Sequence, residues 1–186
     1  MKKIVFIVGS LRENSFNRQM AEVAVQRLDG RVETSFLDYR DVPLMNQDIE
    51  FPTPAAVQKV RETVSSADGI WILTAEYNSS YPGVLKNLLD WLSRPLKPND
   101  RTRTSAVTGK KVTISGASGK SATFGARAKL AELLGAMRMD LMKEPQVGIA
   151  LTGDAFATDV FTICEADQER LQAQADAFVR FLAEEG

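Results

Sequence analysis

The chain has 186 residues, of which 44% are hydrophobic and 25% are charged, and its formal net charge is −1. These values are typical of one soluble globular domain with a sizeable core, so we expect residues 1–186 to form a single domain. The near-neutral charge gives no sign of a nucleic-acid or anionic-membrane partner. No apolar run reaches spanning length, and Met1–Lys3 leads directly into an apolar run rather than a signal peptide.

The cysteine and histidine content limits the kinds of disulfide, active site and metal site that the chain can form. Cys164 is the one cysteine, so no intrachain disulfide can form, and a reducing, cytoplasmic location is expected. The chain contains no histidine. Its absence excludes Ser-His and Cys-His catalysis, and we expect no metal site.

Apolar periodicity predicts strands and helices in alternation. Residues 4–8 form an apolar run typical of a buried strand, and Phe16, Met20, Ala24 and Leu28 follow with helical spacing. Further strands are predicted at 32–37, 70–74, 111–115 and 147–150, and further helices at 57–67, 84–92, 124–134 and 171–182. The predicted connections are 38–53, 75–83, 94–109 and 116–123.

This alternation predicts right-handed crossovers and a parallel sheet covered on both faces. Five such units in this length fit an α/β, flavodoxin-like fold: a doubly wound five-stranded parallel sheet in a three-layer α/β/α sandwich. Ligands bind such sheets beyond the carboxyl ends of the strands, at the switch point. We therefore expect the loops 9–18, 75–83 and 115–123 to converge on one site.

The first of these loops has the side chains expected of a phosphate site. The first turns of a helix present unpaired N–H groups and the positive end of the helix dipole, which favour an anion. Ser10, Ser15 and Asn17 can add hydrogen bonds, and Arg12 offers a fork of donors. The alternative interpretation is that Ser15 and Asn17 only cap the helix.

The second loop, 74–83, places polar groups beside an aromatic ring. Exposed N–H groups and the Asn78 amide could read the polar edge of a flat heterocycle, and Tyr77 could cover part of its face. The alternative is a plain surface turn. Glu76 is either a general base or a hydrogen-bond partner for a helix, and we favour the second.

Two phosphate-binding motifs are not matched. The turn after the first strand is not G-x-G-x-x-G, which argues against a dinucleotide bound through that turn. Gly119-Lys120-Ser121 ends like a P-loop, but a P-loop requires glycine at the position of Ile114, inside a predicted strand. We interpret that match as a coincidence.

Two longer motifs resemble the signatures of the NAD(P)H-dependent FMN reductase family, which includes bacterial chromate/quinone reductases and some azoreductases. They are Gly9-Ser10-Leu11-Arg12-x-x-Ser15-Phe16-Asn17-Arg18 and Glu76-Tyr77-Asn78-x-Ser80-x-Pro82-Gly83-x-Leu85-Lys86-Asn87-x-x-Asp90-Trp91. The loop Asp38-Tyr39-Arg40-Asp41-Val42-Pro43-Leu44 also resembles the family, and the likeness runs from Lys3 to about Leu134.

The resemblance implies a flavin site. Residues of the first motif would hold the FMN phosphate, residues of the second would line the isoalloxazine, and 115–118 would close the other side. The cofactor-binding residues it implies are Ser10, Arg12, Ser15, Phe16, Asn17, Ala75, Glu76, Tyr77, Asn78, Ser115, Gly116, Ala117 and Ser118. The chain departs from the family at Ala75, where proline is common, and in a longer loop after the fourth strand.

The activity implied is hydride transfer from NADPH or NADH through bound FMN to quinones, azo compounds, metal-oxyanions or free flavin. The redox chemistry belongs to the cofactor, so no catalytic side chain is named. The resemblance also implies a homodimer or homotetramer, and Trp91 is interpreted as either core or subunit interface. Lys97, Arg101 and Arg103 in 94–109 could meet the 2′-phosphate of NADPH, although solvated surface charge is the favoured interpretation.

Two other classes of function stay open. A flavodoxin-type electron carrier has the same fold without its own NAD(P)H oxidation, but such carriers usually have strongly acidic surfaces and no arginine in the phosphate loop. A nucleotide-binding regulator or glycosyl-transferring enzyme on a similar sheet is the third class.

Overall fold

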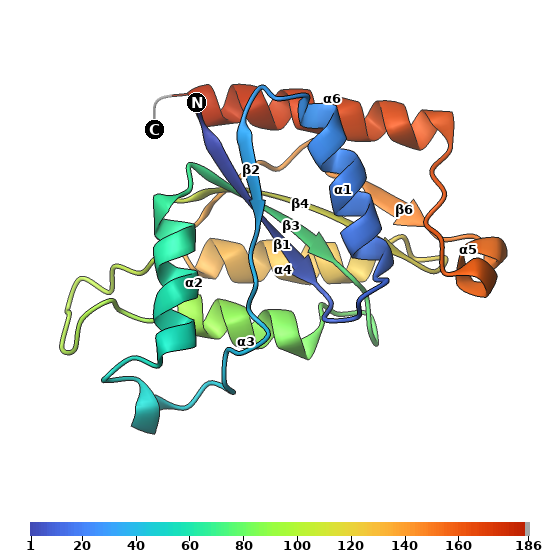
Figure 1. The fold of residues 1–186 in the computed structure, drawn as a ribbon. Coiled ribbons are helices and arrows are strands. Elements are labelled where there is room, and N and C mark those ends of the chain that lie inside the picture. Colours follow the sequence, from blue (N-terminus) through green and yellow to red (C-terminus); the bar gives the residue numbers. More distant parts are fainter. Residues whose placement is uncertain (185–186) are drawn as a thin grey trace.

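The computed structural model describes residues 1–184 and shows a parallel sheet between two layers of helices (Figure 1). The strands are β1 (Lys3–Gly9), β2 (Glu33–Phe36), β3 (Gly69–Thr74), β4 (Lys111–Ser118), β5 (Asp140–Leu141) and β6 (Gly148–Ala150). The helices are α1 (Phe16–Leu28), α2 (Ala55–Ser66), α3 (Gly83–Leu92), α4 (Phe124–Ala136), α5 (Gly153–Thr158) and α6 (Glu165–Ala183), with a 3₁₀ turn, η1, at Gln47–Ile49. None of the helices within residues 1–184 is both long and apolar enough to cross a membrane.

The strand order is β2-β1-β3-β4-β5, with every pair parallel. This order confirms the predicted doubly wound, flavodoxin-like sandwich. β6 lies beside the carboxyl end of β4, where Gly116 pairs with Gly148 and Ser118 with Ala150. The last position of the sheet is therefore shared by two short strands, β5 at the start of β4 and β6 at its end.

Side chains that alternate along the strands build one core on each face of the sheet. In β1, Val5 and Ile7 pack with apolar residues of α2, α3 and α4. Phe6 and Val8 point to the other face, which α1 and α6 cover. Helices thus cover both faces of the sheet.

A buried glutamine fixes α6 to the middle of the sheet. Gln174 has no exposed surface, and its amide donates to the Thr113 hydroxyl at 2.8 Å and accepts from the Val147 N–H at 3.0 Å. The Ser115 hydroxyl donates to the same amide oxygen at 2.8 Å and accepts from the indole N–H of Trp71 at 2.9 Å. These groups therefore satisfy one another's hydrogen bonds in the interior of the protein.

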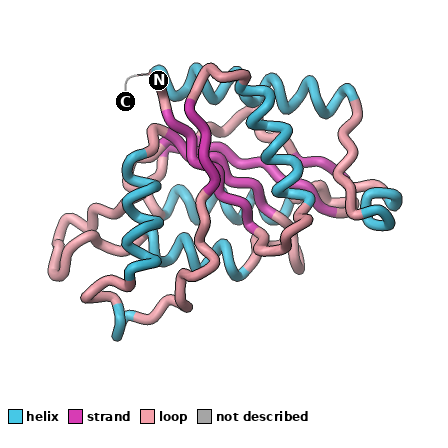
Figure 2. The backbone as a smooth tube through the Cα atoms, viewed as in Figure 1, coloured by secondary structure: helices cyan, strands magenta, loops and turns pink. Residues whose placement is uncertain are grey.

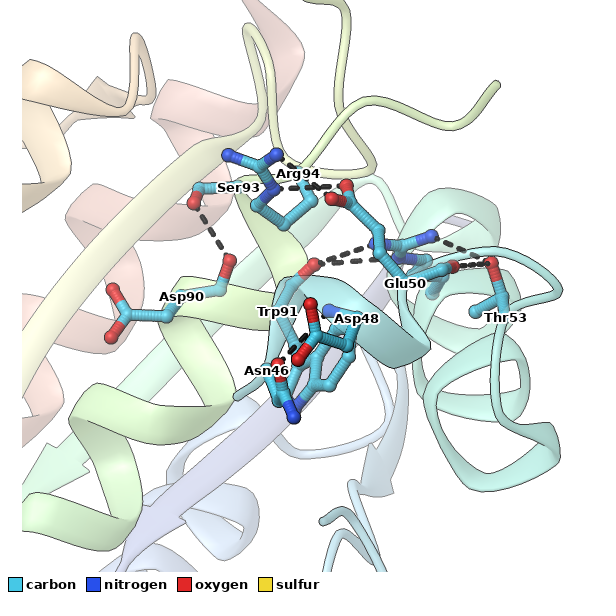
Figure 3. Close-up of polar contacts among 9 residues, drawn as sticks. Asn46, Asp48, Glu50, Thr53, Asp90, Trp91, Ser93 and Arg94 are labelled. Atoms are coloured by element: carbon cyan, nitrogen blue, oxygen red, sulfur yellow. Dashed lines mark hydrogen bonds and ion pairs between the residues drawn. The ribbon is translucent and has the colours of Figure 1, made fainter. Parts of the chain in front are cut away.

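The long loop 38–53 is bound to the C-terminal end of α3 and to the residues just after it (Figure 3). The Arg94 guanidinium donates twice to the Glu50 carboxylate, at 2.9 and 2.8 Å. Arg61 donates to the Trp91 carbonyl at 3.3 and 3.1 Å, at the last turn of α3, and the Trp91 indole donates to the Pro43 carbonyl at 2.8 Å. Trp91 is fully buried within the chain, so of the two interpretations left open, core or subunit interface, the structure supports the core.

The structure corrects several local predictions. Residues 116–118 were predicted as loop, but they continue β4 because β6 pairs with them. Phe124, predicted on the buried stripe of its helix, is 73% exposed, and the buried residues of α4 are Ala126, Leu130 and Leu134. The two-residue β5 and the six-residue α5 were not predicted, since neither is long enough to show a period.

The insertion 94–109 lies at the opposite end of the sheet from the loops that follow β1, β3 and β4 (Figures 1 and 2). It follows α3 and leads into the first residue of β4, whereas the predicted site lies beyond the last residues of the strands. Lys97, Arg101 and Arg103 are exposed there. This position agrees with solvated surface charge rather than with a role at the predicted cofactor site of the same chain.

Gly116 in β4 lies against the backbone at the end of β3 and leaves no room for a side chain. A Cβ atom at this residue would lie 2.2 Å from the Thr74 carbonyl oxygen, whereas one at Gly119 would meet nothing within 4 Å. We expect Gly116→Ala to lower the free energy of unfolding by about 1–3 kcal/mol, because backbone must move to relieve the clash. Gly119→Ala, the matched control, should change it by less than about 0.5 kcal/mol. Urea denaturation measures both, and equal stabilities would contradict the packing argument.

Candidate functional site

A cavity of about 430 Å³ opens at the carboxyl ends of β1, β3 and β4. Residues of all three predicted loops line it, together with a segment that was not predicted. The lining residues are Ser10, Arg12, Ser15, Phe16, Asn17, Ala75, Glu76, Tyr77, Ala117, Ser118, Gly119, Leu151, Phe156 and Asp159. The convergence expected from the topology is therefore present in the structure.

The first wall is the start of α1. Ser15 is the residue before the helix, in extended backbone, and within residues 1–184 its hydroxyl makes no capping hydrogen bond. The first N–H groups of a helix have no partner inside it, so at Phe16 and Asn17 they are available to a ligand. The dipole of α1 adds positive potential at the same point. This wall can receive an anion.

The Asn17 side chain ties this wall to the neighbouring strand. Its amide donates to the Ala117 carbonyl at 3.0 Å and accepts from the Ala117 N–H at 2.8 Å. Asn17 is 3% exposed and Ala117 is 2% exposed. Neither Ser15 nor Asn17 caps α1 with its side chain, so the interpretation that these residues serve only as helix caps is wrong.

Arg12 is the one cation among the described residues that line the cavity. Its guanidinium lies 5.0 Å from the centre of the Phe16 ring and donates to the Asp159 carboxylate at 2.5 Å. Its backbone N–H donates to the Ser10 hydroxyl at 3.3 Å. Ser10 and Arg12 also line an adjacent cavity of about 560 Å³, on the side of β2.

The second wall is a tight turn after β3. Tyr77 and Ser80 exchange two backbone hydrogen bonds, at 2.9 and 3.1 Å. Asn78 and Ser79 between them both have left-handed backbone, with φ of 53° and 57°, as in a type I′ turn. Tyr77 lines the cavity and remains 58% exposed, whereas Asn78 lies outside the cavity.

Glu76 holds the turn against α4. Its carboxylate accepts from the Ala126 N–H at 2.8 Å, in the first turn of that helix. Burial is the largest influence and raises the pKa of the Glu76 carboxyl, but hydrogen bonds from Ser121 and from the first N–H groups of α4 outweigh it, so the pKa is lowered. The carboxylate is already bound and acidic, which fits a helix partner rather than a general base.

The third wall is the end of β4, and only part of the predicted segment forms it. Ala117 and Ser118 line the cavity, together with Gly119. Ser115 and Gly116 do not, because Ser115 is fully buried and faces Trp71 and Gln174. Ser115 and Ala117 point to the same face of β4, so the difference is one of depth: Ser115 lies inside the sheet, whereas Ala117 and Ser118 lie at the end of the strand, where the cavity opens.

The fourth wall, formed by 151–159, was missed. The Leu151 N–H donates to the Ser118 carbonyl at 2.7 Å, and the Phe156 ring packs edge-on against Phe16 at 5.6 Å. Asp159 follows α5 directly. One residue in the sequence could have indicated the start of α5. Thr152 is its N-cap, and its hydroxyl accepts from the Ala155 N–H at 3.2 Å.

Fold and site together define a class of protein. The strand order is flavodoxin-like, and the cavity at the switch point joins an arginine and a helix N-terminus to a turn that presents an aromatic ring. Such a site suits a phosphate-bearing ligand with a flat ring.

Comparison with known proteins identifies the family. Residues 2–154 match the model of the NADPH-dependent FMN reductase family. A 2-hydroxy-1,4-benzoquinone reductase from a Burkholderia species is 32% identical over 181 residues, with 97% of this chain and 96% of the relative covered. An NAD(P)H-dependent FMN reductase from Pseudomonas aeruginosa is 32% identical over 177 residues, with 94% and 92% covered.

A solved structure is similar along the whole chain. FerB, a flavoenzyme NAD(P)H:(acceptor) oxidoreductase from Paracoccus denitrificans, superposes with a TM-score of 0.86 at 30% identity, covering 98% of each chain. The chain therefore belongs to the NADPH-dependent FMN reductase family. The resemblance seen in its two motifs is confirmed, and the protein is an oxidoreductase.

The contact between Glu76 and α4 predicts a pH-dependent stability. The pKa of the Glu76 carboxyl is lowered in the folded state. The carboxylate therefore stabilises the fold fully above the unfolded-state pKa, and this stabilisation is lost as pH falls through the folded-state pKa. We expect Glu76→Gln to lower the free energy of unfolding by about 1 kcal/mol at neutral pH, with the gap closing below about pH 4.

Urea denaturation at neutral and acidic pH measures this gap. Glu132→Gln, at an exposed position of α4, is the control. Its free energy of unfolding should differ little from that of the unchanged protein at either pH. A gap for Glu76→Gln that stays constant with pH would contradict the charge-based explanation.

Proposed function

We propose that this chain binds FMN in the cavity at the carboxyl end of the sheet and uses NADPH or NADH to reduce quinones. The observation that carries the proposal is the meeting of the Arg12 loop with the Tyr77 turn in one cavity at the switch point. The names of the relatives, a benzoquinone reductase and an FMN reductase, support the same activity. Azo compounds, metal-oxyanions and free flavin are the alternative acceptors.

The donor groups present fit the phosphate of FMN. The Arg12 guanidinium, the Ser10 and Ser15 hydroxyls and the first N–H groups of α1 would hold it, a set that is rich in donors. The Ser15 hydroxyl supports this assignment because it makes no capping bond within the described chain. The Asn17 amide, committed to Ala117, would shape this wall rather than bind the phosphate with its side chain.

The remaining walls fit a flat ring. Tyr77 and the backbone of its turn would lie on one side, and Ala117, Ser118 and Gly119 on the other. When bound, FMN supplies the redox chemistry by taking a hydride from the nicotinamide and passing two electrons to the acceptor. The chain positions the ring, excludes water with Phe16 and Phe156, and supplies backbone N–H groups to its polar edge.

The assembly and location are also proposals. We infer a homodimer or homotetramer in the cytoplasm, built from the single domain expected from the length of the chain. Phe124 is 73% exposed and Tyr77 is 58% exposed. Their segments adjoin, since a Cβ at Gly125 would lie 3.1 Å from the Ser79 carbonyl. An apolar surface beside the cavity supports a subunit contact there.

The phosphate assignment predicts a difference between two arginines. Arg12→Ala should weaken FMN binding about tenfold to a hundredfold, the size of a lost charge-assisted hydrogen bond, and leave riboflavin binding nearly unchanged. Arg103→Ala, at an exposed position in the insertion between α3 and β4, should affect neither ligand. Fluorescence titration of the flavin-free protein measures all four affinities, and equal FMN affinities in the two variants would remove the assignment.

Steady-state oxidation of NADPH separates a reductase from an electron carrier. With FMN bound and benzoquinone supplied, we expect many turnovers of NADPH per protein, because the chain positions both reactants at one ring. Free FMN at the same concentration and the flavin-free protein are the controls. A rate no higher than that of free FMN would favour the flavodoxin-type carrier. A protein that stays colourless with added FMN would favour the nucleotide-binding regulator or glycosyl-transferring enzyme.

A further inference from the structure

The arginine assigned to the flavin phosphate already has an anionic partner in its own chain. Nη1 of Arg12 donates to Oδ1 of Asp159 at 2.5 Å, and the two side chains are 48% and 41% exposed. Both line the cavity beside Ser10 and Ser15. A phosphate that binds Arg12 must therefore share it with Asp159 or displace Asp159.

Asp159 is fixed in this position by its backbone. It ends α5 in left-handed conformation, with φ of 60°. Its carbonyl accepts from the Gln19 amide at 3.1 Å, and the same amide accepts from the Phe161 N–H at 2.8 Å. Gln19 belongs to α1, so the helix that begins at the predicted phosphate site also holds the segment that carries the carboxylate (Figure 1).

The Asp159 carboxylate strongly affects the net charge of the residues that line the cavity. Arg12 is the one cation among the described residues that line the cavity, and the other acid there, Glu76, is engaged by the first turn of α4. Asp159 occupies a donor of the guanidinium and offsets its positive charge where a second anion would approach. Both effects oppose phosphate binding, since like charges close together disfavour each other.

We propose that Asp159 is an internal competitor for Arg12 that selectively weakens the binding of phosphate-bearing flavin and speeds its release. This inference rests on the proposed function, which places the FMN phosphate at Arg12. Its consequence is that the protein exchanges FMN with solution more readily than the arginine alone would allow. The α5 segment thereby decides how firmly the cofactor is retained.

Asp159→Asn tests the proposal with little disturbance. Asparagine accepts left-handed backbone as aspartate does, and the contacts of the Asp159 carbonyl with Gln19 are unchanged. Asp159→Gly also tolerates this conformation and serves as a second variant. Asp29→Asn is the matched control, because Asp29 is an exposed C-cap with φ of 45° at the other end of α1.

Binding of FMN and of riboflavin to the flavin-free protein is the readout. We expect Asp159→Asn and Asp159→Gly to tighten FMN roughly threefold to fivefold, as one partly exposed ion pair would allow, and to slow FMN release by the same factor. Riboflavin, which has no phosphate, should bind as it does to the unchanged protein. Asp29→Asn should alter neither ligand.

Three results would overturn the proposal. Weaker FMN binding in Asp159→Asn would mean that the carboxylate positions Arg12 instead of competing for it. Equal changes for FMN and riboflavin would mean that it only shapes the cavity. An unchanged FMN affinity would mean that the pair has no effect.

Arg12→Ala separates these failures from failure of the proposed function. If that variant keeps the FMN preference over riboflavin of the unchanged protein, the phosphate does not bind at Arg12 and both proposals fall. If it loses the preference while the Asp159 variants bind FMN normally, only the competition is wrong.

Discussion

The two hydrogen bonds between the Asn17 amide and the backbone of Ala117 hold the site together. They join the first turn of α1 to the end of β4, although β3 lies between β1 and β4 in the sheet. Both groups are almost fully buried, so losing either partner would leave unsatisfied polar atoms away from water. The distance between the anion-binding wall and the opposite wall is therefore set by a short, fixed contact.

The remaining walls are held in a similar way, by polar side chains that bind backbone or one another. Glu76 fixes the Tyr77 turn to α4, and Gln19 fixes the α5 segment to α1. Each tie runs between elements that are far apart in the sequence and adjacent at the carboxyl end of the sheet. Acidic groups near the cavity are thus already engaged, Glu76 by helix N–H groups and Asp159 by Arg12. What remains for a ligand is the dipole of α1, hydroxyl and N–H donors, and the Arg12 guanidinium in competition with Asp159.

The sequence predicted those parts of the fold whose pattern repeats. The apolar run of β1 and the spacing of Met20, Ala24 and Leu28 located their elements closely, because burial on one face imposes a period. β5 and α5 were not predicted, because two and six residues are too few to show a hydrophobic period. Phe124 was misplaced for a related reason. Its spacing fits the buried stripe of α4, but it is the first residue of the helix, beyond the edge of the core.

The candidate site also has residues that the sequence could predict and residues that it could not. Residues on contiguous loops, such as Ser10 and Tyr77, could be proposed from local chemistry and from the resemblance to a family. Ser115 could not be placed correctly, because the predicted strand ends there, whereas β4 continues to Ser118 through its pairing with the distant β6. The end of the strand, and with it the cavity, therefore lies beyond Ser115. Asp159 shows the limit most clearly. It lies beyond residue 154, where the family match ends, and nothing in its neighbours marks a ligand group. Only tertiary contact, 147 residues from Arg12 along the chain, brings its carboxylate to the guanidinium. The affinity of a phosphate site depends on the net charge around it, so the residue that we propose as the competitor for Arg12 is one that no local pattern could indicate.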